Sequence, residues 1–111
     1  MDTELLKGTL SLLILSLLNR KPMYGYEIAA TVHRDTDGAF QWREGSLYPS
    51  LHKMEQGGLI VGEWEEKETG RKRRYYHITK EGRAALKEKL ESWSELCAAV
   101  NTILGKSDGK A

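Results

Sequence analysis

The chain has few of the residues from which a covalent or metal-built fold is made. Its 111 residues include one cysteine, Cys97, so no internal disulfide can form and a thiolate-rich structural zinc site is not expected. The three histidines, His33, His52 and His77, have no metal-ligand spacing. We therefore expect no metal and no cofactor, and the cysteine usage fits a reducing cytoplasm.

Long apolar runs are also missing. The segment LLILSLL at residues 12–18 is too short to cross a bilayer. The first residues, MDTELLKG, carry acids where a secretory signal would carry basic residues. Hydrophobic residues make up 40% of the chain and charged residues 30%, which is the composition of a globular domain. We expect one compact cytoplasmic unit with no membrane partner.

Net charge is nearly absent, at +1, but it is unevenly distributed. Residues 67–80 carry six basic side chains and one acidic side chain around a Thr69-Gly70 turn. The chain is therefore a neutral protein with one concentrated positive site, not a generally basic one. Such a cluster can simply keep a turn solvated, so its surroundings must decide whether it binds a polyanion.

Apolar periodicity predicts several helices in the first half of the chain. Residues 4–19 are rich in leucine on more than one side, so this helix needs cover from a second surface. Leu5 and Leu12 are therefore candidates for contact with a second copy of the chain. Pro22 ends this pattern, and a second helix is expected over residues 24–34.

A third helix is expected to begin at Ser46, which is a good N-cap residue. Pro49 then falls in the first turn, where its missing N–H removes no helical hydrogen bond. The pair Gly57-Gly58 supplies a left-handed stop at the other end. The spacing i, i+4 and i+7 predicts that one stripe of this helix faces the core: Leu47, Leu51 and Met54.

The second half of the chain predicts a hairpin followed by one long helix. Residues 59–66 and 73–79 are β-branched and aromatic runs on either side of a short turn. Thr79 can cap a helix over residues 80–104. This helix carries an apolar seam with the 3.5-residue period of a helix pair, which predicts dimerisation through Leu86, Leu90, Trp93, Cys97, Val100 and Leu104.

The expected fold class is therefore α+β and mainly α: a winged helix-turn-helix with a C-terminal dimerisation helix. Residues 1–80 would form the winged helix-turn-helix DNA-binding domain, and residues 81–104 the dimerisation helix of the same compact unit. Residues 105–111 are expected to form a flexible tail.

In winged helices the helix before the hairpin lies in the DNA major groove, and the hairpin tip meets neighbouring phosphates or the minor groove. The basic cluster lies where a DNA backbone would pass. Double-stranded DNA is the expected partner. The expected contact residues are Ser46, Tyr48, Ser50, His52 and Lys53 on the helix and Arg71, Lys72 and Arg73 on the hairpin.

Two other classes of function compete with DNA binding. A winged-helix module that binds protein instead of DNA has no need of a basic hairpin. A small hydrolase would need a nucleophile and base such as Ser46 with His52 and Glu44. Ser46 and His52 point in different directions on one short helix, and no glycine-rich elbow precedes the serine, so this function is disfavoured.

Three blocks of sequence also resemble a known family, the PadR-type transcriptional regulators. They are YGYEI (24–28), GSLYPSLHKMEQGGLI (45–60) and GRKRRYYHITKEG (70–82). The resemblance covers nearly the whole chain. With its single C-terminal helix, the chain is similar to the small subgroup of the family. It implies a winged-helix homodimer that represses transcription at a pseudo-palindromic operator.

The block LESWSEL at residues 90–96 adds an expectation about a ligand. In small multidrug-responsive members of the family, a tryptophan on the last helix lines a flat hydrophobic pocket at the dimer centre, and this block matches that position at Trp93. The resemblance therefore implies a planar aromatic effector that binds at Trp93, although a tryptophan in such a seam can equally be plain core.

Overall fold

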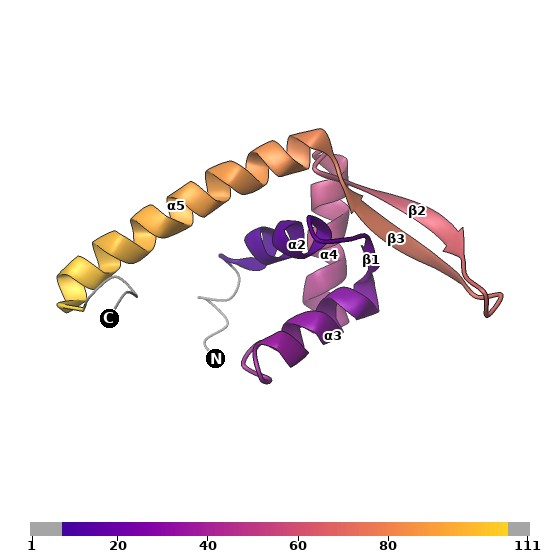
Figure 1. Cartoon of the computed structure of the whole chain (residues 1–111), viewed down its shortest axis with the longest axis horizontal. Helices are drawn as coiled ribbons and strands as arrows, with labels where there is room; N and C mark the ends of the chain where they lie inside the picture. The colour runs from indigo at the N-terminus through magenta and orange to yellow at the C-terminus, as the bar shows by residue number, and fades with distance from the viewer. Residues whose placement is uncertain (1–7, 107–111) are drawn as a thin grey trace.

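Helices, a small sheet and a long final helix follow one another in the order expected for a winged helix. The structure is a computed structural model that describes residues 8–106. Its elements are α2 (Leu10–Leu18), β1 (Met23–Tyr24), α3 (Gly25–Asp35), α4 (Glu44–Gln56), β2 (Ile60–Glu66), β3 (Lys72–Ile78) and α5 (Lys80–Leu104). In Figure 1 the hairpin projects from one end of the molecule and the far end of α5 from the other. The predicted mainly helical α+β class is confirmed.

The core lies where α2, α3 and α4 meet the base of the sheet. The stripe predicted for α4 is confirmed, because Leu47, Leu51 and Met54 are all buried. Trp42 is buried directly before α4 and ties the incoming chain to this core. The same cluster contains further apolar side chains from every element, among them Ile14, Leu15, Ile28, Ile60, Tyr76 and Leu86.

The sheet contains one strand that periodicity did not predict. β1 pairs with β3, and β3 pairs with β2, so the antiparallel order is β1-β3-β2. Tyr24 pairs with Tyr75 and therefore belongs to β1, so α3 begins one residue later than predicted, at Gly25. Because β1 covers only the base of β3, the outer part of the hairpin consists of two strands.

The predicted start of α4 is wrong. The helix begins at Glu44 with Arg43 as its N-cap residue, and no side chain caps it. The backbone N–H of Ser46 already donates to the Arg43 carbonyl (2.9 Å), so Ser46 lies inside the first turn. Pro49 consequently lies within the helix and not in its first turn. Trp42, which precedes Arg43, is buried at this entry point.

The start of α5 is as predicted. The Thr79 hydroxyl oxygen accepts a hydrogen bond from the Gly82 N–H (3.0 Å) and lies 2.9 Å from the Leu59 carbonyl. This links the end of the hairpin to the first turn of α5. The left-handed Gly105 follows the helix. Leu5 and residues 107–111 lie outside the described residues. Within residues 8–106, no helix has the length and apolarity to cross a membrane.

The contact between Gly82 and the hairpin predicts a strong size limit at this position. A methyl group on Gly82 would overlap the Leu59 carbonyl and press on Ile78. We expect Gly82→Ala to lower the free energy of unfolding by about 2 kcal/mol, because this carbonyl is backbone and cannot move aside freely.

Gly45→Ala is the matched control, since Gly45 is also helical and nothing lies within 4 Å of an added methyl group. It should leave stability unchanged or raise it slightly. Chemical denaturation of both variants measures the difference, and equal midpoints would contradict the packing described at Gly82.

Candidate nucleic-acid interface

The tip of the hairpin carries two exposed cations. The turn is closed by hydrogen bonds from the Gly70 N–H to the Lys67 carbonyl (2.8 Å) and from the Lys67 N–H to the Arg71 carbonyl (3.2 Å). Gly70 has a φ of +78°, a left-handed conformation that favours glycine. Arg71 and Lys72 are exposed, and neither forms an ion pair with any described residue. Both are therefore available to a polyanion.

The other cations of the cluster are held by neighbouring side chains. Strand alternation places Arg73 and Arg74 on opposite faces of β3. The Arg73 guanidinium lies 4.4 Å from the centre of the Tyr24 ring, which is cation–π geometry. Lys67 lies 4.5 Å from the Tyr75 ring centre and 3.3 Å from the carboxylate of Glu65. The basic cluster is thus divided between an open tip and a structured base.

One carboxylate joins α4 to both strands of the hairpin. Glu55 Oε2 accepts a hydrogen bond from the Arg74 guanidinium (2.6 Å) and another from the Gly62 N–H (3.0 Å). Glycine at position 62 leaves room for the Arg74 guanidinium, which a side chain there would overlap. Sequence reasoning missed Glu55. The signal that could have indicated it is Gly62, since a glycine inside a strand marks a close approach.

The predicted contact residues of α4 lie on different sides of the helix. Ser46, Tyr48, His52 and Lys53 are exposed. Tyr48 leans toward α3, where its hydroxyl leaves no room for a side chain at Gly25. Ser50 is half-buried, and its hydroxyl donates to the Ser46 carbonyl (3.1 Å). A groove against α2 contains Ser50 and Lys53, so these two lie on the flank away from the hairpin.

The face of the hairpin that carries Arg73 also carries two carboxylates and a histidine. Glu63, Glu65 and His77 can each offer one ligand atom within 4.8 Å of the others. Glu65 already has partners: His77 Nε2 lies 2.9 Å from Oε2, and Lys67 is paired with Oε1. The hydrogen bond with His77, and then Lys67, lowers the pKa of the Glu65 carboxyl. Glu65 is thus already engaged by two neighbouring side chains.

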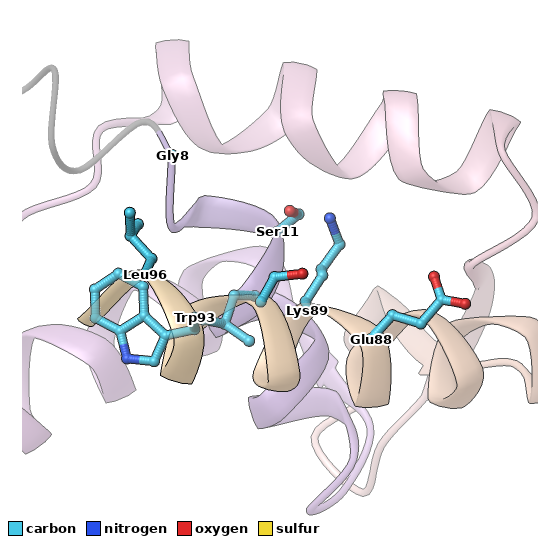
Figure 2. A pocket seen from close by; sticks show the side chains of 8 residues that line it. Gly8, Ser11, Glu88, Lys89, Trp93 and Leu96 are labelled. Atoms are coloured by element: carbon cyan, nitrogen blue, oxygen red, sulfur yellow. The ribbon is translucent and has the colours of Figure 1, made fainter. Parts of the chain in front are cut away.

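A second surface is formed by α2 and the middle of α5. A pocket of about 340 Å³ lies between them, and Figure 2 shows Trp93 and Leu96 on α5 across from Ser11 on α2. Leu12, predicted to lie at a dimer contact, lines the same pocket. Polar groups also reach it, including Glu88 and Lys89. The pocket combines an indole, aliphatic groups and both signs of charge.

Beyond this pocket α5 exposes an apolar face. Most of the predicted seam lies on it, and the exposed large side chains of α5 are Leu90, Trp93, Leu96, Val100, Ile103 and Leu104. Cys97 is half-buried. Leu86 differs from the rest of the seam, because it is buried within the core of the same chain. It contributes to the fold of one protomer and presents no surface to a second copy.

These features define the class of the protein: a winged helix whose hairpin carries exposed cations at its tip. Residues 14–88 match the family described as the Transcriptional regulator PadR-like family. The chain belongs to this family of DNA-binding transcriptional regulators and is not an enzyme.

Solved structures and a curated relative agree with this assignment. A transcriptional regulator from Clostridium thermocellum is 32% identical with a TM-score of 0.84, over 92% of this chain and 96% of that one. A PadR-like transcriptional regulator from Bacillus cereus is 35% identical with a TM-score of 0.81, over 94% and 99%. The transcriptional regulator Rv3488 from Mycobacterium tuberculosis is 46% identical over 56 residues, which are 50% of this chain and 51% of that protein.

Replacing Glu55 with glutamine separates the role of its charge from the role of its hydrogen bond to the Gly62 N–H. Glu55→Gln keeps an acceptor for the Gly62 N–H but removes the ion pair with Arg74. We expect a loss of about 1 kcal/mol in the free energy of unfolding, because the pair is only partly shielded from water. We also expect weaker DNA binding, although removal of an acid by itself favours a polyanion.

Glu66→Gln is the control, since Glu66 is exposed on the same hairpin and forms no ion pair with a described residue. It makes the same charge change and should strengthen DNA binding slightly. Thermal unfolding and titration of labelled duplex DNA measure both effects. Identical behaviour of the two variants would show that Glu55 does not position the hairpin.

Proposed function

We propose that the chain is a transcriptional repressor that binds a pseudo-palindromic operator as a homodimer. The observation that carries this proposal is the pair of free cations, Arg71 and Lys72, on a hairpin fixed to α4 through Glu55. A helix in the major groove and a cation-bearing tip held at a set distance from it can contact one face of a duplex together.

Within this proposal the two elements have different tasks. Side chains of α4 face base edges or the phosphates beside them; they are Ser46, Tyr48, Ser50, His52 and Lys53. The hairpin supplies Arg71, Lys72 and Arg73 to phosphates, whose contacts add affinity without sequence information. The exposure of Ser46, Tyr48 and His52 supports their assignment most directly, whereas Ser50 and Lys53 lie on the flank toward α2.

We predict that Arg71→Ala combined with Lys72→Ala weakens binding to operator and random DNA alike. The plot of log affinity against log salt should become shallower by roughly one for each lost phosphate contact, or about four for the dimer. Arg83→Ala with Lys87→Ala removes the same charge from exposed positions of α5 and serves as the control. Equal salt slopes for the two double variants would refute the assignment of the tip.

The apolar face of α5 supports the proposed homodimer. Ile103 is 86% exposed and five other large apolar side chains lie along the same helix, which is costly for a helix that remains alone in water. The seam repeats at the period of paired helices. A second copy related by a two-fold axis covers this face and brings two α4 helices to half-sites about one DNA turn apart.

We predict that Leu90→Glu combined with Val100→Glu abolishes the dimer, because the seam would then bury unpaired charge. Ser94→Glu with Thr102→Glu adds the same charge to exposed polar positions of α5 and should leave the dimer intact. Sedimentation velocity distinguishes the monomer from the dimer. A dimer that survives in the Leu90/Val100 variant would place the interface elsewhere.

We place the effector site of the proposed repressor at Trp93. Trp93 is 43% exposed and lines the pocket between α2 and α5, so a second copy would enclose its indole beside the two-fold axis. An indole face suits a planar aromatic ligand, and a cationic one in particular. Binding there would change the angle between the two α5 helices and thereby the separation of the two α4 helices.

A further inference from the structure

A cleft separates α4 from the face of the hairpin that turns toward it. Its volume is about 290 Å³, and the residues that matter for its chemistry are Tyr24, Tyr48, Trp64, Arg73 and Arg74. The cleft joins the base of the sheet, one end of α4 and the outer hairpin. It therefore lies between the helix that would enter a major groove and the tip that would reach beyond it.

The described lining of this cleft contains donors and aromatic rings but no carboxylate. The charge of Arg74 is compensated by Glu55, whereas Arg73 forms no ion pair with a described residue. A hollow on the other side of Tyr24 and Arg73 differs, because Glu27 and Glu65 line it. The cleft beside α4 therefore has cations and no carboxylate in its described lining, whereas the hollow has both signs of charge. This donor set suits a phosphodiester.

The walls of the cleft are held in place by packing. The Tyr48 ring lies against the backbone of Gly25, where any side chain would collide with it. Tyr24 is fixed by an edge contact with Tyr75 (5.5 Å between ring centres), and Arg73 stacks on Tyr24. Groups already ordered in this way lose little conformational freedom when they bind a ligand.

Trp64 is the feature that packing leaves unexplained. It is 70% exposed, although it lies beside Arg74 in the sheet and lines the cleft. An indole is amphipathic, with a broad apolar face and one N–H donor. A deoxyribose beside a phosphate offers the matching surfaces.

We propose that this cleft holds one segment of the operator's sugar-phosphate backbone, with Trp64 packed against deoxyribose and Arg73 and Tyr48 donating to the phosphate. This inference rests on the DNA-binding function proposed above and adds Trp64 and Tyr24 to the residues that contact or position the backbone. The clamped segment is the strand that separates the major groove entered by α4 from the minor groove beside the hairpin tip.

The first test follows Trp64 by fluorescence. Trp93→Phe leaves two indoles, the buried Trp42 and the exposed Trp64, so acrylamide quenching in the free protein reports mainly on Trp64. Saturating operator duplex should protect Trp64 from acrylamide. The Trp93→Phe, Trp64→Phe variant is the control and should show no change with DNA. Quenching of Trp64 that is the same with and without bound DNA would overturn the proposal.

The second test is affinity. Trp64→Ala should weaken binding to operator and random duplex by the same factor, on the order of tenfold, because the lost contact is apolar and independent of sequence. The salt slope should stay at its wild-type value, unlike that of Arg73→Ala, which should become shallower. The thermal midpoint of Trp64→Ala should match that of the wild type, since Trp64 packs little in the free protein.

The outcomes separate this inference from the function on which it rests. If the wild type binds duplex DNA and Trp64→Ala binds it equally well, the clamp is refuted while the DNA-binding function stands. If the wild type fails to bind any duplex at low salt, both are refuted.

Discussion

The arrangement of α4 and the hairpin, which form the proposed DNA-binding face, depends on the hydrogen bonds that Glu55 accepts from Gly62 and Arg74. An isolated two-stranded ribbon has little stability of its own in water, and β1 supports only the base of this one. The carboxylate ties α4 to the backbone of β2 and to a side chain of β3. These contacts link the hairpin to α4, as simultaneous contact with neighbouring grooves would require.

The same constraint explains why so many basic residues occur near one turn. Alternation along β3 gives successive cations different environments: Lys72 is open to solvent, Arg73 stacks on Tyr24, and Arg74 pairs with Glu55. A run that looks uniform in sequence thus contains cations that build the face and cations that remain free. In the account proposed here, the free ones meet phosphate.

Much of the fold could be predicted because its signals are local. The core stripe of α4, the hairpin and the helix capped by Thr79 follow from periodicity and turn residues, and the structure confirms them. The start of α4 could not be predicted in this way, because no side chain caps it, and β1 is too short to show a pattern. For the candidate site, the sequence indicated the tip and α4 but not Glu55 or the cleft at Trp64, because these depend on contacts between segments distant in the chain.

The most direct test of the account is hydroxyl-radical footprinting of the wild-type protein on an operator obtained by selection from random duplexes. The account predicts two equivalent blocks of protected sugars about one DNA turn apart. Within each block, protection should extend without a gap from the edge of the major groove across the backbone to the adjacent minor groove. A single block, or protection confined to one groove, would contradict a rigid helix-and-hairpin face in a two-fold dimer.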